Sequence, residues 1–241
     1  MILTFIIFTV SFSFFLYYNI SILKNMFLKG EILMNKKALI LVDIQNDFCE
    51  GGALAVKDGD LVVPVANKLI SLFNQNNDLV IGTKDWHPAS HKSFAINSNG
   101  NIGELGELNG LPQVWWPVHC VENEYGSKFH KHLKGVDITI FKGQDPEVDS
   151  YSAFFDNGKK HKTDLDKVLK DKDIDTLYIM GLATDYCVKF TVLDALELGY
   201  KVYLVEDGCR GVNISYDDSI KAIETMKNSG AIIINSNDLK A

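Results

Sequence analysis

Residues 38–43 read Ala-Leu-Ile-Leu-Val-Asp, a nearly uninterrupted apolar run that ends in a carboxylate. A strand buried on both faces of a parallel sheet has this composition. Similar runs recur along the chain and alternate with segments of helical spacing. The apolar runs cover residues 79–83, 138–142, 176–181, 201–206 and 231–235, and the helical segments cover 61–73, 165–169, 185–198 and 215–228. We therefore expect a three-layer α/β/α fold, in which residues 34–241 form one domain around a six-stranded, mainly parallel sheet.

Composition excludes several classes of protein. Hydrophobic residues make up 46% and charged residues 23% of the 241 residues, which is ordinary for a globular protein and unlike a disordered or collagen-like chain. The 24 Lys and Arg are outnumbered by 31 Asp and Glu, and they form no basic stripe, so we expect no nucleic-acid partner. Four cysteines are too few for a disulfide framework and suit a reducing compartment.

An apolar leader, residues 1–33, precedes this pattern. Seventeen of its first 23 residues are apolar and none is charged, which is long enough to cross a bilayer. It lacks the positive start and the small-residue cleavage site of a secretory signal. We expect translation to begin at Met34, so that the leader is a mis-assigned start. The alternative is an N-terminal membrane anchor that leaves the rest of the chain in the cytoplasm.

Four reactive side chains fall at the carboxyl ends of the expected strands, where open α/β sheets bind their ligands. They are Asp43, Asp85, Lys142 and Cys187. Cys187 lies in the first turn of an expected helix, after Thr184 or Asp185 as N-cap, and the helix dipole there lowers the pKa of a thiol. The sequence thus indicates a nucleophile at Cys187, with a buried apolar role as the alternative. Cys49, Cys120 and Cys209 have no such helix start, and we interpret them as structural.

A second group of residues could bind a metal. Asp85 and His87 lie two apart on one side of an extended segment, and His91 and His119 follow within an irregular region, residues 86–136. One carboxylate and two imidazoles with open positions are typical of a catalytic metal site and permit Zn, Fe or Mn. The alternative is a set of unliganded polar loop residues. The other three histidines lie in charged surroundings and are expected to be solvated: His130, His132 and His161.

Six motifs together resemble the nicotinamidases, which are bacterial nicotinamide and pyrazinamide amidohydrolases within the isochorismatase-like hydrolases. They are VDIQNDFCEGGALAV (42–56), KDWHPASHKSF (84–94), WPVHC (116–120), FKG (141–143), DSYSAFF (149–155) and GLATDYCVKFTVLDAL (181–196). The resemblance runs from about residue 37 to residue 235, and the leader has no counterpart in the family.

The resemblance implies roles residue by residue. The catalytic triad matches Asp43, Lys142 and Cys187, and the metal ligands match Asp85, His87 and His119. His91 matches a position that is a ligand in some members and a neighbour of the ligands in others. The backbone N–H groups of Ala183 and Cys187 match the oxyanion hole, with a cis peptide bond before Ala183. Phe48 and Trp116 match the aromatic walls of the substrate pocket, and Tyr186 stands where some members carry His, which leaves fine specificity open.

The resemblance also implies an activity. We expect a metal-dependent cysteine amidohydrolase that converts nicotinamide to nicotinate and ammonia through a thioester, in NAD salvage, and that also acts on pyrazinamide. The cofactor would be one divalent ion, Zn before Fe or Mn. The expected partner is the small substrate in the cytoplasm, without nucleic acid or membrane, and a homo-oligomer is left open. The alternatives are another isochorismatase-like amidase and a non-enzymatic metal- or nucleotide-binding module.

Overall fold

Each expected apolar run becomes a strand of one sheet. The strands are β1 (Lys36–Val42), β2 (Leu79–Asp85), β5 (Ile138–Lys142), β6 (Ile174–Leu182), β7 (Lys201–Arg210) and β8 (Ile232–Ile234). They lie in the order β5-β2-β1-β6-β7-β8. The pairs β1–β2, β2–β5, β6–β7 and β7–β8 are parallel. The six-stranded, mainly parallel sheet predicted from the sequence is therefore confirmed.

This computed structural model describes residues 36–240. The expectations for the leader, a start at Met34 or a membrane anchor, fall on residues 1–33 and lie outside the described residues. Residues 37–240 belong to one compact unit. Within the described part of the chain, no helix is both long and apolar enough to span a bilayer.

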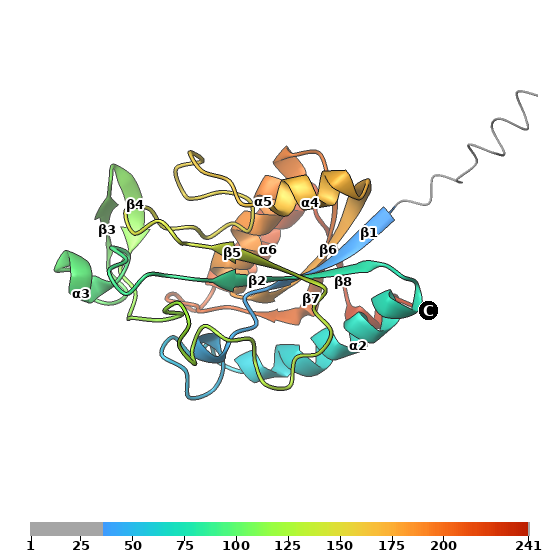
Figure 1. The fold of residues 1–241 in the computed structure, drawn as a ribbon, viewed down its shortest axis with the longest axis horizontal. Coiled ribbons are helices and arrows are strands. Elements are labelled where there is room, and N and C mark those ends of the chain that lie inside the picture. The colour runs from blue at the N-terminus through green and yellow to red at the C-terminus, as the bar shows by residue number, and fades with distance from the viewer. Residues whose placement is uncertain (1–35, 241) are drawn as a thin grey trace, which may run out of the picture. The chain divides into compact units, whose positions relative to one another are not determined.

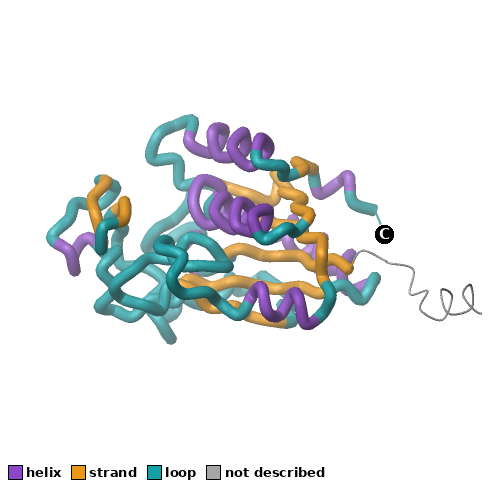
Figure 2. Tube along the Cα trace, turned by 90° about the horizontal axis from the view of Figure 1, so that it is seen from above, coloured by secondary structure: helices purple, strands orange, loops and turns teal. Residues whose placement is uncertain are grey.

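Helices cover both faces of the sheet (Figures 1 and 2). They are α2 (Val62–Gln75), α4 (Leu165–Asp171), α5 (Lys189–Glu197) and α6 (Asp218–Asn228). Figure 1 shows α2 on one side of the sheet and α4 and α5 on the other. The helix α2 buries Leu69 and Phe73 at helical spacing and carries Pro64 in its first turn, where no N–H is needed.

The expected helix 185–198 begins differently from the prediction. Residues Thr184–Val188 form a π-helical turn, η3, and α5 follows from Lys189. Ala183 is the N-cap residue, and neither Thr184 nor Asp185 caps the helix. The Asp185 carboxylate instead accepts hydrogen bonds from the amides of Val212 and Asn213, at 2.9 and 2.7 Å. The capping prediction is wrong because the loop after β7 uses this buried carboxylate.

The region expected to be irregular contains short elements of its own. Between β2 and β5 lie α3 (Ala95–Ser98) and a hairpin of β3 (Leu105–Leu108) and β4 (Leu111–Val114). Its two-residue turn is Asn109-Gly110, and both residues have positive φ, 52° and 81°. An Asn-Gly pair suits this turn because both residues tolerate a left-handed backbone. Figure 1 shows these elements beyond the carboxyl end of β2.

The centre of the sheet requires a close approach of two strands. A Cβ on Gly181, which has a φ of 131°, would lie 2.1 Å from the carbonyl oxygen of Val42. Only glycine fits there, since any side chain would push β6 away from β1. This contact brings the ends of the two strands, and the residues after them, to the same edge of the sheet.

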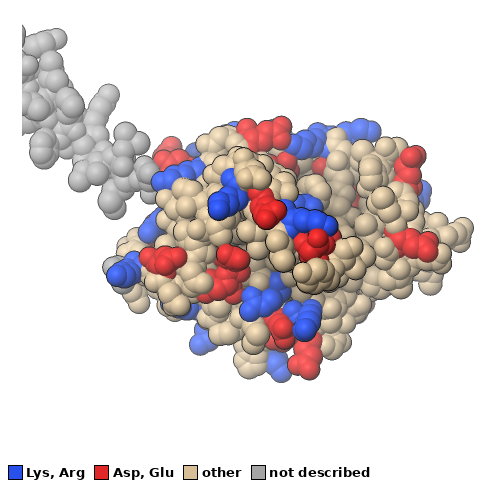
Figure 3. All heavy atoms as spheres, turned by 180° about the vertical axis from the view of Figure 1, so that it is seen from behind, with Lys and Arg blue, Asp and Glu red and all other residues tan. Residues whose placement is uncertain are grey.

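The surface carries charges of both signs. On the face drawn in Figure 3, Lys and Arg side chains are interspersed with Asp and Glu side chains. This pattern agrees with the net charge of −7 of the whole chain, which is acidic but not extreme.

Candidate active site

Asp43 directly follows β1, and the neighbouring strand orients its carboxylate. Its backbone is left-handed, with a φ of 48°, a conformation that Asp tolerates better than most residues. The Asp43 amide donates to Thr83 Oγ1 at 3.1 Å, and that hydroxyl donates to Asp43 Oδ1 at 2.5 Å. Because Thr83 lies on β2 and is fully buried, it holds the carboxylate in one orientation.

Lys142, the last residue of β5, joins the other candidate catalytic groups. Its Nζ lies 2.9 Å from Asp43 Oδ2 and 3.4 Å from Cys187 Sγ. It also donates to Asp85 Oδ1 and, at 2.9 Å, to the carbonyl oxygen of Ser150. The structure therefore brings together all four strand-end residues, which the sequence could place only at a common edge.

The charges in this buried group stabilise one another. Burial alone would lower the pKa of Lys142, but the carboxylates of Asp43 and Asp85 raise it well above its ordinary value. Burial would raise the pKa of Asp85, yet Lys142 and His87 hold it well below its usual range. Burial raises the pKa of Asp43, and the charge on Lys142 only partly offsets this. Asp43 is thus the more basic of the two carboxylates.

The expectation of a low thiol pKa at Cys187 is wrong. Burial raises the pKa of this thiol well above its ordinary value, and the positive charge on Lys142 does not compensate. The carboxylates of Asp43 and Asp85 raise it further, an effect that helix position alone could not reveal. The resting group is therefore a thiol that needs a base, and the carboxylate of Asp43 is hydrogen-bonded to it.

Asp85, His87 and His119 form a buried cluster whose ligand atoms all lie within 4.8 Å of one another. Asp85 Oδ2 lies 3.6 Å from His87 Nε2 and 3.7 Å from His119 Nε2. A strand-like bridge between His87 and Val121 draws the two histidine segments together. The sequence prediction that these three side chains converge agrees with this geometry.

The hydrogen bonds of the two histidines fit a bound cation. Their Nδ1 atoms lie 2.7 Å from the carbonyl oxygen of Gly143 and 2.8 Å from that of Pro117. Because a carbonyl only accepts, each Nδ1 carries a hydrogen, and each Nε2 faces Asp85, where it offers a lone pair once it is deprotonated. Three acceptors that face one another in a buried space suit a divalent metal, and such outer hydrogen bonds are typical of metal-binding histidines.

Gly143 makes room for this arrangement. Its φ is 68°, and a Cβ there would lie 2.6 Å from His87 Nδ1. A side chain would therefore displace the ring that its own carbonyl oxygen orients. The FKG motif thus supplies Lys142 to one cluster and a backbone carbonyl to the other.

His91 lies beside this cluster but is held differently. Its ring centroid lies 4.3 Å from that of His87. Burial lowers the pKa of His91 to about 4, so the ring is neutral at pH 7. Its Nδ1 accepts from the amide of Ser93 at 3.1 Å, which leaves the hydrogen on Nε2, a buried atom with no hydrogen-bond partner among the described residues. This tautomer fits a hydrogen-bond donor better than a metal ligand.

A small pocket opens onto both clusters. Its lining includes two groups of predicted residues. The expected aromatic walls are Phe48, Trp116 and Tyr186, and the residues expected to form the oxyanion hole are Ala183 and Cys187. The bond between Leu182 and Ala183 is cis, as the resemblance implies.

The pocket also contains residues to which the sequence prediction gave no role. They are Leu54, Asp149, Tyr151 and Val212. The Tyr151 hydroxyl accepts from Gln113 Nε2 at 3.2 Å and from Trp116 Nε1 at 3.3 Å, which fixes one aromatic wall. Asp149 and Tyr151 lie within the DSYSAFF motif, so that motif was the signal for them. Leu54 and Val212 carry no pattern that could have identified them.

Comparison with known proteins identifies the family. The pattern of the isochorismatase domain matches residues 37–238. The chain is 55% identical over 202 residues to the nicotinamidase of Escherichia coli K12, a match that covers 83% of this chain and 95% of that protein. The chain belongs to the isochorismatase family. Within this family, its similarity is to the nicotinamidases.

Solved structures of isochorismatase-family proteins share the fold. A nicotinamidase/pyrazinamidase of Acinetobacter baumannii is 39% identical, with a TM-score of 0.81, over 86% of this chain and all of that one. The pyrazinamidase of Pyrococcus horikoshii, solved in complex with zinc, is 38% identical, with a TM-score of 0.70, over 83% of this chain and 99% of that one.

Proposed function

We propose that this protein is a metal-dependent amidohydrolase that converts nicotinamide to nicotinate and ammonia, a reaction of NAD salvage. The family assignment and the 55% identity to a nicotinamidase support the activity. The observation that carries the assignment of residues is the contact of Lys142 with Asp43 and with Asp85 and Cys187, the last two of which line the pocket. A non-catalytic binding module gives no reason to bury a lysine between two carboxylates and a thiol.

Asp43 acts as the base in this proposal. It takes the proton of the Cys187 thiol while sulfur attacks the carboxamide carbon, because the raised pKa of the thiol prevents spontaneous ionisation. Lys142 stays charged and balances the carboxylates through each step, as its raised pKa requires. Thr83 holds Asp43 in line for the transfer.

The oxyanion that forms is assigned to the backbone N–H groups of Ala183 and Cys187, which both line the pocket. A comparable oxyanion donor contributes about 2.7–4 kcal/mol to the stability of the transition state. Protonated Asp43 then gives its proton to the leaving nitrogen, which departs as ammonia and leaves a thioester on Cys187. Water attacks the thioester with Asp43 as base, and nicotinate leaves as the thiol re-forms.

Asp85, His87 and His119 would hold one divalent ion, with zinc favoured by the zinc complex of the Pyrococcus relative. When bound, the ion supplies a Lewis acid that can hold the ring nitrogen of the substrate. His91 would act beside the site as a hydrogen-bond donor. Phe48, Trp116 and Tyr186 select a flat ring by stacking, which also suits pyrazinamide.

Ammonia release from nicotinamide, measured with and without a chelator, tests the proposal. We expect one ammonia and one nicotinate per turnover, and loss of activity after chelation that added Zn²⁺ restores. Turnover of other small amides in preference to nicotinamide would favour a different amidase of the family. Absence of any amide hydrolysis by the zinc-loaded protein would contradict an enzymatic function. A cytoplasmic location, tested by cell fractionation, remains part of the proposal.

A further inference from the structure

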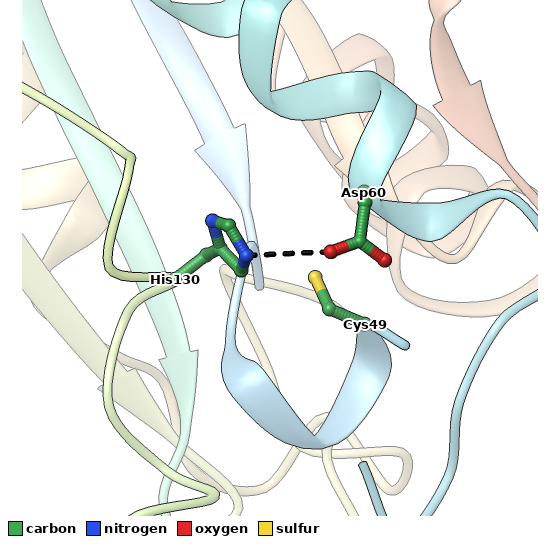
Figure 4. Close-up of side chains that lie close together, drawn as sticks. All are labelled: Cys49, Asp60 and His130. Carbon is green, nitrogen blue, oxygen red and sulfur yellow. Dashed lines mark ion pairs between the residues drawn. The ribbon is translucent and has the colours of Figure 1, made fainter. Parts of the chain in front are cut away.

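A second group of metal-ligating side chains lies outside the proposed active site. Figure 4 shows Cys49, Asp60 and His130, which point toward one another from three separate segments. Their ligand atoms all lie within 4.8 Å of one another. Cys49 follows the short helix η1 (Asn46–Phe48), Asp60 lies in η2 (Gly59–Leu61), and His130 lies on the chain between β4 and β5. None of the three has a role in the proposed reaction.

His130 does not match its sequence-based expectation. Its side chain is only 14% exposed rather than solvated, and its Nε2 pairs with Asp60 Oδ1 at 3.3 Å. Cys49 is 2% exposed. A histidine and a cysteine expected to play no part in any site are therefore brought together with a carboxylate by the fold.

We propose that Cys49, Asp60 and His130 form a second metal site, for a divalent ion of the zinc class that prefers thiolate and imidazole ligands. Tetrahedral zinc has ligand bonds of about 2.0–2.3 Å, which set its ligands about 3.4 Å apart. The 3.3 Å separation of His130 Nε2 and Asp60 Oδ1 matches that spacing. Sulfur, nitrogen and oxygen ligands in one set favour zinc over magnesium or calcium.

The surroundings provide access for an ion. The three residues line a solvent-open pocket of about 370 Å³, together with polar side chains that include Glu50 and His132. The Asp60 side chain is 40% exposed, so the carboxylate stands at the mouth while the thiol lies at the buried end. Three protein ligands leave a fourth position for water from the pocket.

Proton and charge balance are met. Burial, helped by the charge on Asp60, raises the pKa of the Cys49 thiol to about 12, so the metal-free residue is a thiol. The sulfur–metal bond forms as the thiol proton leaves to solvent, because a coordinating thiol is deprotonated. One thiolate and one carboxylate then neutralise the two positive charges of the ion.

His130 has to change its tautomer when the ion binds. Its Nδ1 accepts from the amide of His132 at 3.3 Å, so in the neutral ring Nε2 carries the hydrogen and lies 3.3 Å from Asp60 Oδ1. An ion takes the Nε2 lone pair once that hydrogen has moved to Nδ1. The change breaks a long, weak hydrogen bond, and the new N–H can donate to water in the open pocket.

A metal ion bound at this second site would restrain the wall of the active-site pocket. Cys49 directly follows Phe48, which lines that pocket, and Asp60 Oδ2 already accepts from the amide of Glu50 at 2.7 Å. An ion held by Cys49, Asp60 and His130 would link η1, η2 and the chain around His130. We therefore expect loading of this second site to raise the thermal midpoint, as any ligand selective for the folded state does.

Metal content per chain tests the proposal. Wild-type protein loaded with Zn²⁺ and desalted should hold two equivalents, and Cys49→Ser and Asp60→Asn should each hold one. Cys209→Ser is the matched control, because Cys209 is also a buried thiol but lies in neither cluster, and it should hold two. Circular dichroism should show native folding for every variant. Because the Asp60 side chain is partly exposed, Asp60→Asn still tests the site if Cys49→Ser disturbs folding.

Cobalt identifies the ligand. Wild-type protein loaded with Co²⁺ should show sulfur-to-cobalt charge-transfer absorption, which Cys187→Ser retains and Cys49→Ser loses. His119→Ala should lose one zinc equivalent and keep this absorption, which separates the second site from the proposed active site. One zinc equivalent in the wild type, or charge-transfer absorption that survives Cys49→Ser, would overturn the proposal.

Discussion

The two three-residue clusters differ in how their histidines are held. At Asp85, both histidines donate Nδ1–H to backbone carbonyls, so their Nε2 atoms face a carboxylate. At Asp60, His130 accepts at Nδ1, and its Nε2 lies 3.3 Å from the carboxylate. The first arrangement already presents its Nε2 atoms to a cation, whereas the second must first change the tautomer of its histidine. We conclude that backbone hydrogen bonds to the histidines, more than the identity of the ligands, decide how strongly a cluster is organised for metal.

The largest effect should come from a change that leaves both clusters intact. Cys187→Ala should lower turnover of nicotinamide by about 10⁴-fold or more, since a missing nucleophile stops the covalent route. Metal content should match the wild type, measured by elemental analysis on the same sample. A variant that keeps a tenth of the activity would show that Cys187 is not the nucleophile.

Removal of a metal ligand near Asp85 should distinguish the two clusters by their zinc content and their effect on turnover. His119→Ala and Asp85→Ala should each lose one zinc equivalent and more than about 100-fold in turnover, because even outer hydrogen-bond partners of a metal site cost about 10–100-fold. His119→Ala is the cleaner variant, since Asp85 also pairs with Lys142. Full zinc content in both variants would refute the assignment of ligands.

A smaller loss of turnover should follow when the orientation of the base Asp43 is weakened and every metal ligand is left unchanged. Thr83→Val removes the hydroxyl that donates to Asp43 and should lower kcat by about tenfold, the value of one buried hydrogen bond, with KM unchanged. Thr83→Ser should restore most of the rate. A change confined to KM, or no recovery in the serine variant, would show that Thr83 has only a packing role.

The smallest effect is expected at His91. Its tautomer is opposite to those of His87 and His119, so His91→Ala should keep its zinc and lose less than about tenfold in turnover. Zinc analysis beside steady-state kinetics checks this. A loss of metal equal to that of His119→Ala would make His91 a direct ligand and would weaken the argument from tautomers.

Strand positions were predictable because burial on both faces leaves a strong apolar signal. Asp43, Asp85, Lys142 and Cys187 followed from it, because parallel strands end at one edge. The hairpin over 105–114 was missed although Asn109-Gly110 is a strong turn signal, since its flanking strands are only four residues long.

The failures at the site have a different cause. The raised pKa of Cys187 comes from its burial and from carboxylates on other strands, and the environment of His130 from a contact with η2. Such effects depend on distances between segments remote in sequence, which spacing along the chain does not contain. The role of Asp185 was missed for the same reason, because its partners lie in the loop after β7.

The strand order has a consequence for how the protein acquires activity. Asp43, Lys142 and Cys187 follow or end β1, β5 and β6, which occupy the stretch β5-β2-β1-β6 of the sheet. No two of these strands are joined by a short turn, so each contact among the three residues waits for a long loop to close. A chain that has formed only its helices and one strand pair has no complete triad. Recovery of ammonia release during refolding should therefore occur later than the return of the helical circular dichroism signal. The rate at which turnover returns would then report how fast the sheet is completed.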